Sequence, residues 1–468
     1  MKILLPILAC GCLSLALLGG CDSSTGTVST STGMVAGNQA QLQRSVDSLL
    51  SQVASIRGLS WKRPVVANWT TRLHLPSLLD SLATAQGYSS GGSSPDEIFQ
   101  ALGYVDPGVS LGSSQSQLVS SGVAAFYEGH TDHLWVVTDQ AQDPSLTHTI
   151  VHELVHALQD QSFGDSVPST AELDEDEAFT FLEEGEAEYV ATLWSLGNPT
   201  LGAFDLLFPN WTLKMVADSL PSWGYGSLPL LATIPTFAPY SCGVNFVHWV
   251  HEQSGWSGVN GLHTDHSRST TQTLHPMAGL HKGFVDWGDH QFASTADWET
   301  FGSGRLGELY LTTLLYSQGN PATTGDASGW NGDRFWIWRT RDSLHHAVVG
   351  RVSMDSSSLA TSFLRRWGES FSRRIGIAAA LQGVDSFQVS SVDSQSVVRG
   401  VRHGTELYLG WGDLHGLRMD SIWTELAGLT PSPGAAGRAL ADPATPASGP
   451  RWRGPRVHPP WPGHRSDL

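Results

Sequence analysis

Cysteine is scarce in this chain of 468 residues, which contains only Cys10, Cys12, Cys21 and Cys242. Three of the four lie within the first 21 residues. Small exported domains that depend on disulfides are dense in cysteine, so the spacing excludes a disulfide-stapled scaffold. We expect no disulfide in the mature chain.

Positive charge is also in short supply, because 26 Lys and Arg face 44 Asp and Glu, for a net charge of −18. Such a chain repels phosphates, which argues against a nucleic-acid partner. No run of 18 or more apolar residues follows the N-terminal segment, so no transmembrane helix is predicted. The hydrophobic share of 40% is adequate for a packed core, in one large or two ordinary domains.

The first 20 residues have the pattern of a lipoprotein signal peptide. A short positive start, Met1-Lys2, precedes an apolar core that ends in LGGC, which resembles a bacterial lipobox. Cys21 is then the lipidated residue, and it cannot pair with Cys242. We expect a lipid-anchored, extracytoplasmic protein of the cell envelope, periplasmic or surface-exposed. The alternative is an ordinary secretory signal cut near Gly20, which would give a secreted protein.

Composition divides the rest of the chain into a main body and two flanking segments. Residues 21–40 are rich in Ser, Thr and Gly and are typical of a flexible tether. Residues 431–468 hold 9 of the 24 prolines and no lysine, which predicts a disordered tail. A basic tail that binds an anionic surface is the alternative. The body, 41–430, could form two lobes at 41–200 and 201–430.

The run HTIVHELVHALQDQ carries the strongest chemical signal. On a helix, His152 and His156 lie on one face, so both imidazoles can bind one Zn²⁺. Glu153 lies beside the metal, where a carboxylate can take a proton from a zinc-bound water. The apolar face would be Ile150, Leu154, Ala157 and Leu158. Asp143-Pro144 suits an N-cap followed by proline at the first helical position. The competing interpretation is a chance pattern of ordinary histidines.

A catalytic zinc usually has a third protein ligand, and residues 171–190 offer nine carboxylates with no basic residue. A nearby cation would offset their mutual repulsion, although a solvated helix face is the common alternative. If 179–190 is one helix, Glu184 and Glu188 form a stripe beside its apolar side. Glu183 and Glu186 would point elsewhere and could be solvated. Gly185 then suggests a close approach of this helix to the helix of His152, as a shared metal requires.

The segment EEGEA resembles the N-E-G-F-A type of segment in which gluzincin peptidases place their third, glutamate ligand. The resemblance puts that role on Glu184. Glu188, one turn later, is suited to hydrogen-bond a ligand histidine from behind. Asp174 is a further supporting carboxylate, and Asp174 or Glu177 is the next choice of ligand.

The resemblance extends to a family of bacterial and archaeal secreted or surface proteins described as zinc-metallopeptidase-like. Ordered segments across roughly residues 40–345 carry it: IRGLSWKRPV, GVAAFYEGHTDHLWVV, HELVHALQDQ, LEEGEA, YSCGVNFVHWVHEQSGW, STTQTLHP, LGELYLTTLL and GWNGDRFWIW. It implies an α+β, zincin-like fold, mainly helical, with a small mixed β-sheet beside the active-site helix. It also implies one Zn²⁺ and a peptide or protein substrate. Thr271 departs from the family pattern, in which an acidic residue is expected.

Two more residues are candidates for stabilising an oxyanion at the reacting carbonyl, His275 in STTQTLHP and Tyr240. Structural packing is the alternative for both. The other histidines between 263 and 290 fit no simple ligand spacing.

Periodicity and turn residues predict the surrounding elements. Expected helices are 41–56, 75–85, 95–102, 242–252 and 355–372, the last with Asp355 as N-cap. Expected strands are 123–127 and 133–138, joined as a hairpin, and a third strand follows the turn at Asn331-Gly332-Asp333. We expect a loop at 111–117 and irregular structure at 201–239. The strand 133–138 or its partner could bind an extended peptide.

Together these features predict a membrane-anchored zinc metallopeptidase with Glu153 as general base. The competing hypothesis is a non-catalytic surface-binding or structural lipoprotein on a zincin scaffold. A hydrolase without zinc is a third reading, but no nucleophile motif such as G-x-S-x-G is present.

Overall fold

The computed structural model describes the central part of the chain with several gaps. The described residues are 36–85, 95–164, 172–197, 210–265, 268–279, 283–292, 298–319, 327–342, 345–381, 384–392, 396–413, 417 and 419–433. The expected signal peptide and residues 21–35 of the expected tether, including Cys21, lie outside them. So does the tail from residue 434 on.

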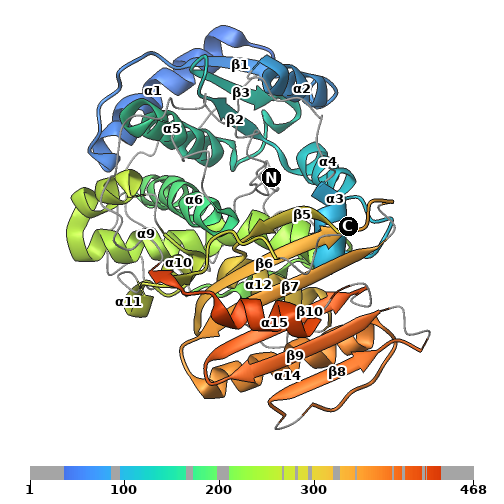
Figure 1. Ribbon diagram of the computed structural model, residues 1–468. Helices are drawn as coiled ribbons and strands as arrows, with labels where there is room; N and C mark the ends of the chain where they lie inside the picture. Colours follow the sequence, from blue (N-terminus) through green and yellow to red (C-terminus); the bar gives the residue numbers. More distant parts are fainter. Residues whose placement is uncertain are drawn as a thin grey trace.

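A three-stranded mixed sheet forms one end of the molecule (Figure 1). Its order is β1-β3-β2, with β1 (Val66–Thr70) parallel to β3 (His133–Val137) and β2 (Ala125–Glu128) antiparallel to β3. Apolar side chains of β1, β2 and β3 pack against α1 (Gln39–Arg57) and α5 (Leu146–Phe163) in one core cluster. The expected hairpin is therefore present, and its edge strand β2 lies directly against α5.

Three smaller helices and one short turn also belong to the N-terminal part of the chain, and of the helices the second packs in the core of the larger sheet described below. They are α2 (Leu75–Ala85), α3 (Pro95–Leu102), α4 (Leu111–Gly122) and the 3₁₀ turn η1 (Thr138–Gln140). The helices expected at 41–56, 75–85 and 95–102 are confirmed as α1, α2 and α3.

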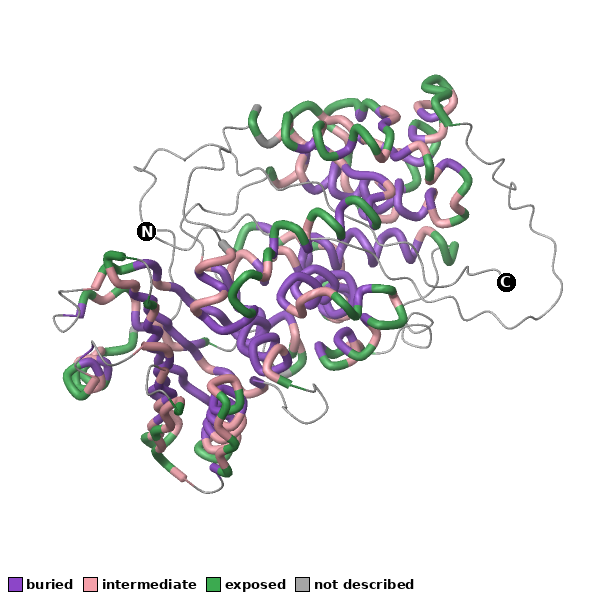
Figure 2. Tube along the Cα trace, turned by 90° about the vertical axis from the view of Figure 1, so that its right-hand side faces the viewer, coloured by how far each residue is buried: buried purple, intermediate pink, exposed green. Residues whose placement is uncertain are grey.

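Two long helices form the centre of the molecule, α6 (Leu173–Ser195) and α9 (Leu230–Thr264). Both are mostly buried, and Figure 2 shows the central helices in the colour of buried residues. Among the described residues, α9 alone is long and apolar enough to suit a membrane span, but most of it is buried inside the protein. Shorter helices surround them: α8 (Leu213–Ser219), α10 (Thr270–Leu274), α11 (Pro276–Gly279) and α12 (Gly307–Ser317).

A six-stranded antiparallel sheet forms the other end, with strand order β5-β6-β7-β10-β9-β8 (Figure 1). The strands are β5 (Glu299–Gly304), β6 (Trp330–Arg339), β7 (His346–Met354), β8 (Ser386–Ser390), β9 (Val397–His403) and β10 (Glu406–Gly412). Helix α14 (Ser357–Arg374) packs on it, α15 (Met419–Gly428) follows it, and β4 (Val285–Asp286) pairs with β11 (Ser432–Pro433). The largest apolar core joins this sheet to α6, α9 and α12. One core therefore spans residue 200, the boundary between the two lobes considered above.

Several expectations about elements are wrong. Residues 111–117 belong to α4, because Ser110 caps that helix by accepting a hydrogen bond from Ser113 N. Within 201–239, where irregular structure was expected, α8 and the start of α9 are helical. Two buried prolines, Pro235 and Pro239, lie inside α9, where dense packing against α6 outweighs their helix-breaking tendency.

Smaller corrections concern boundaries. Ser356 rather than Asp355 caps α14. Strand β6 begins at Trp330, with a register shift before Gly332, so the expected turn is a bulge inside the strand. The tail cannot begin at 431, because Ser432 and Pro433 pair with β4.

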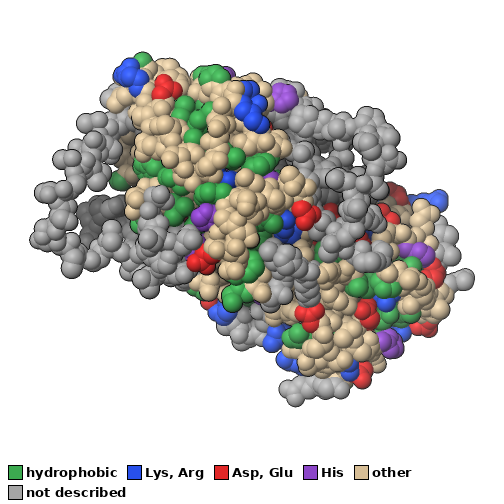
Figure 3. Space-filling model, turned by 90° about the vertical axis from the view of Figure 1, so that its left-hand side faces the viewer, with side chains coloured by type: hydrophobic (Ala, Val, Ile, Leu, Met, Phe, Trp, Pro, Cys, Tyr) green, Lys and Arg blue, Asp and Glu red, His purple; other side chains and the backbone are tan. Residues whose placement is uncertain are grey.

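On the face shown in Figure 3, described side chains of both charges are scattered among hydrophobic ones.

Candidate metal centre

Helix α5 presents the HELVH residues to α6. The helix begins at Leu146 after Ser145, and Asp143 instead accepts hydrogen bonds from the backbone N–H and hydroxyl of Ser145. The expected N-cap at Asp143 is therefore wrong. The expected apolar face is buried throughout, in contact with the small sheet and α1. This packing fixes the rotation of α5 and turns His152 and His156 toward α6.

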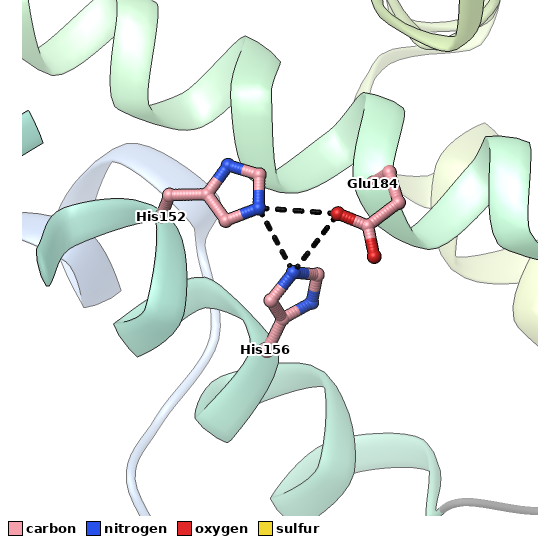
Figure 4. Close-up of side chains that lie close together, drawn as sticks. All are labelled: His152, His156 and Glu184. Atoms are coloured by element: carbon pink, nitrogen blue, oxygen red, sulfur yellow. Dashed lines mark hydrogen bonds and ion pairs between the residues drawn. The ribbon is translucent and has the colours of Figure 1, made fainter. Parts of the chain in front are cut away.

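Two imidazoles and one carboxylate converge between α5 and α6 (Figure 4). His152 Nε2 lies 3.2 Å from Glu184 Oε2, His156 Nε2 lies 3.4 Å from the same oxygen, and the two Nε2 atoms are 3.0 Å apart. A tetrahedral zinc with bonds of 2.0–2.2 Å separates its ligand atoms by about 3.3 Å. The three edges of this triangle match that separation.

Glu188 supports the ligand histidine from behind, one helical turn after Glu184. Its Oε2 lies 3.5 Å from His152 Nδ1, and its Oε1 lies 3.3 Å from His148 Nε2. Burial raises the pKa of Glu188, but the two histidines outweigh burial and hold that pKa well below its usual range. The carboxylate is therefore anionic and fixes the orientation of the His152 ring.

The charge of these carboxylates also acts on His152. Burial alone would lower the pKa of this imidazole, yet hydrogen bonds with Glu184 and Glu188 raise it to about 9 in the metal-free chain. The site is thus strongly attractive to positive charge, whether a proton or a metal ion.

His156 is oriented by a separate contact. Its Nδ1 lies 2.8 Å from Gln159 Oε1, and Gln159 Nε2 donates to the backbone oxygen of Glu183 at 3.0 Å. This amide ties the second ligand of α5 to the backbone of α6, next to the third ligand. In both histidines, therefore, Nε2 points into the triangle. Nδ1 points toward a side-chain oxygen, of Glu188 for His152 and of Gln159 for His156.

Glu153 lies on the sheet side of α5, where the backbone N–H of Tyr127 in β2 donates to its Oε2 at 2.9 Å. The Tyr127 hydroxyl oxygen lies 2.8 Å from Asp132 Oδ1 and 3.0 Å from Asp160 Oδ2, so its single proton is shared between the two carboxylates. Because Glu153 and Asp160 are both on α5, Tyr127 contacts the helix at two points, two turns apart. The strand therefore holds the carboxylate of the expected base.

Tyr240 of α9 forms one wall of the centre. Its ring stacks on His152, with centroids 5.5 Å apart and planes inclined by 18°. Tyr240 therefore lies at the site, as expected. Its observed contact is packing against the His152 ring, which was the alternative to an oxyanion role. The whole centre is enclosed, since the exposed fraction is 0% for His152 and Glu184, 1% for Glu153 and 6% for His156.

Most carboxylates of the acidic run are buried rather than solvated, and their countercharges come from distant segments. Glu186, expected to be solvated, is fully buried in an ion pair with Arg57 of α1 and lies 2.5 Å from His263 Nε2. Burial raises the pKa of Glu186, but Arg57 and His263 lower it to about 2. Glu183 is also buried. The expectation that these two residues are solvated is therefore wrong.

Gly185 allows a close helix approach, but the partner differs from the expected one. A Cβ at Gly185 would lie 2.2 Å from the backbone oxygen of Gly243 in α9. The two glycines thus bring α6 against α9. The ligand pair of α6 and α5 does not depend on a glycine contact.

Asp174 does not belong to the centre. It precedes Glu184 by ten residues on α6, about 15 Å at 1.5 Å per residue. Its carboxylate accepts hydrogen bonds from the backbone N–H and hydroxyl of Thr270 and pairs with Arg305. The expected supporting role of Asp174 is therefore wrong. Glu177 accepts a hydrogen bond from the Tyr310 hydroxyl.

His275 also lies elsewhere, since it lines a cavity whose walls include none of the three converging residues. Its Nε2 is 2.7 Å from Glu308 Oε1, and Thr271 donates to Glu308 Oε2 at 2.9 Å. The expected oxyanion role of His275 is not compatible with this position. Glu308 supplies a carboxylate beside Thr271, where the family pattern has an acidic residue.

The donor set fits one zinc ion. His152, His156 and Glu184 form the only group of three or more His, Cys, Asp or Glu in the described part of the chain whose donor atoms all lie within 4.8 Å. Two imidazoles and one carboxylate are the ligand types of catalytic zinc sites, and buried carboxylates supply the compensating charge.

Three contributors to the centre were missed at the sequence level, namely His148, Gln159 and Tyr127. His148 had a signal, because it precedes His152 by the same four residues that separate His152 from His156. Gln159 lies three residues after His156, within reach on the same helix face. Tyr127 acts through its backbone N–H, which leaves no signal in the sequence.

A comparison with known families finds one match, to a domain of unknown function (DUF8575), over residues 296–409. This range covers the six-stranded sheet from β5 to most of β10, with α12 and α14, and excludes α5 and α6. No curated protein and no solved structure matches the chain.

Proposed function

We propose that this protein is a zinc metallopeptidase of the gluzincin type, with a zincin-like fold, that hydrolyses peptide or protein substrates. The observation that supports this most is the triangle of His152, His156 and Glu184, whose edges of 3.0, 3.2 and 3.4 Å suit one zinc ion. Glu153 follows the first ligand directly and has its carboxylate fixed by β2. Ligands and base together are the minimal set for this hydrolysis.

When bound, zinc supplies Lewis-acid polarisation of the scissile carbonyl and lowers the pKa of water in the fourth coordination position. The chain supplies the remaining steps. Glu153 accepts a proton from the attacking water and passes it to the leaving amine. Tyr127 N–H orients that carboxylate through Oε2, while Glu188 and Gln159 orient the two imidazoles.

Strand β2 is the preferred element for peptide binding. Strand β3 is central in the sheet, so of the two hairpin strands only β2 has an outer edge. Val137 N–H donates to Ala124 O, and Tyr127 is in register with Leu134. Because antiparallel pairing alternates, the backbone groups of Ala125 and Tyr127 point away from β3, and of these the Tyr127 N–H is already used by Glu153. An extended peptide that adds to this edge would run beside Glu153.

A second function is favoured by one observation, the burial of the centre. Catalytic zinc sites keep an open position, whereas structural sites are closed. Exposed fractions of 0% for His152 and Glu184 suit a non-catalytic lipoprotein that uses zinc to hold α5 against α6. On that alternative the protein binds zinc but cleaves no peptide.

The experiment that separates the two functions is a peptide-library cleavage assay on full-length protein with one zinc per chain. The peptidase proposal expects cleavage by the wild type and none by Glu153→Gln, which keeps all three ligands. Asp176→Asn, on the same acidic run, is the matched control and should cleave normally. A zinc-loaded wild type that cleaves nothing would favour the structural alternative.

Membrane attachment is proposed from LGGC alone, as a lipid anchor on Cys21 in the cell envelope. Replacing Cys21 by Ser should move the protein from the membrane to the soluble fraction. A variant that still sediments with membranes would refute the anchor.

A further inference from the structure

A cavity lies on the opposite side of α9 from the candidate metal centre. Its volume is about 490 Å³, and α9 contributes Cys242, Asn245 and Trp249 to its wall. Tyr240, by contrast, stacks on His152. At 3.6 residues per turn, Cys242 lies about 200° around the helix from Tyr240. The cavity is therefore a separate site and not an extension of the metal centre.

A buried carboxylate, Glu308 of α12, forms part of this wall. Only 3% of its surface is exposed. Its two oxygens are fixed, since Oε2 accepts from the Thr271 hydroxyl at 2.9 Å and Oε1 lies 2.7 Å from His275 Nε2. These hydrogen bonds satisfy the oxygens and set their direction. A neutral imidazole at His275 leaves the negative charge of Glu308 uncancelled, whereas a protonated one would pair with it, so binding of a cation is tested at a pH above the usual histidine pKa.

Large aromatic side chains supply much of the rest of the wall, namely Trp211, Trp249 and Tyr316. Lys214 also lines the cavity, but it forms an ion pair with Asp218 one turn later on α8. Its charge is therefore already partnered outside the cavity. Aromatic faces beside a fixed carboxylate favour a positively charged guest.

We propose that this cavity binds a small organic cation, an ammonium or guanidinium group on an apolar body. The carboxylate of Glu308 would attract the charge, and the aromatic side chains would cover the body and the cation. A volume of about 490 Å³ suits a small molecule. The cation could belong to a free amine or to a Lys side chain of a peptide. The proposal does not depend on zinc or on peptidase activity.

The test is calorimetric titration of the full-length protein at pH 8, where most histidines are neutral. The probes are 2-phenylethylamine, which is a cation at this pH, and 2-phenylethanol, its neutral analogue of similar size. The amine should bind at least tenfold more tightly than the alcohol. Glu308→Gln should remove this preference, and Asp420→Asn, which removes an exposed carboxylate that does not line the cavity, should leave it intact.

Trp211→Leu provides a second test that does not alter the buried carboxylate. It should weaken amine binding several-fold while thermal unfolding stays cooperative. Equal binding of amine and alcohol by the wild type, or a preference that survives both Glu308→Gln and Trp211→Leu, would overturn the proposal. A competing titration with the peptide acetyl-Gly-Lys-Gly-amide separates the sources, because only a site for Lys side chains would release the amine.

Discussion

The backbone N–H of Tyr127 donates a hydrogen bond to Oε2 of Glu153 at 2.9 Å, across the contact between β2 and α5. The ring hydroxyl of the same tyrosine is held by Asp132 and Asp160. The position of the proposed base therefore depends on how the hairpin is seated on the helix. Loss of the hydroxyl contacts should therefore displace the Glu153 carboxylate without altering a metal ligand.

Tyr127→Phe removes both hydroxyl contacts but keeps the backbone N–H. Hydrogen bonds to charged groups contribute about 1.5–3 kcal/mol each, so stability should fall by a few kcal/mol at most. Zinc content should stay the same, while turnover falls by about 10- to 100-fold because a small displacement of a catalytic group is costly. Tyr104→Phe is the control, since it removes the hydroxyl that donates to Tyr310 O and should leave turnover unchanged. Equal turnover in both variants would contradict the role of Tyr127.

Glu186→Gln should destabilise the fold strongly. The substitution leaves the fully buried guanidinium of Arg57 without its anionic partner, which typically costs about 3–5 kcal/mol. Asp420→Asn removes a carboxylate that pairs with Arg399 but is 92% exposed, and it should change stability by less than about 1 kcal/mol. Denaturant unfolding of the two variants checks the difference. Similar midpoints would mean that the ion pair of Glu186 with Arg57 does not contribute to stability.

Gly185→Ala should also destabilise the protein, because the new Cβ would meet Gly243 O at 2.2 Å and force α6 away from α9. Overpacking of this kind costs about 1–3 kcal/mol. Gly261→Ala is the matched control on α9, where an added Cβ meets nothing within 4 Å. That variant should be neutral or gain up to about 1 kcal/mol. A stable Gly185→Ala protein would show that the two helices are further apart.

The thiol of Cys242 should be inert in the folded protein. It is buried, and burial raises the pKa of Cys242 to about 12, so almost none is thiolate at neutral pH. Iodoacetamide at pH 8 should leave the Cys242 peptide unmodified until denaturant is added, as peptide mass spectrometry can show. Rapid alkylation of the native protein would contradict this burial.

Local spacing carried the predictions that agree with the structure. The four-residue interval between His152 and His156 is enough to place both on one helix face, and EEGEA pointed to the carboxylate that meets them. The helices α1 to α3 and the hairpin followed from periodicity and turn residues for the same reason. Each of these inferences needs only neighbours within a few turns.

Apart from the missed helix α4 and two misplaced N-caps, the errors concern partners that are distant in the sequence. Glu186 looked solvated because its countercharges, Arg57 and His263, are 129 and 77 residues away. Irregular structure was expected up to residue 239, yet tertiary packing buries Pro235 and Pro239 within α9. His275 was placed at the metal centre from its motif, whereas α9 separates the two sites. None of these relationships has a local signature.

The most direct measurement is zinc content per chain in purified full-length protein, by elemental analysis after dialysis. We predict one zinc in the wild type and in Glu153→Gln, less in Glu188→Ala, and none in Glu184→Ala. Glu184→Ala protein that folds cooperatively and still holds one zinc with unchanged affinity would contradict the proposed centre. So would a wild type without zinc after growth in zinc-supplemented medium.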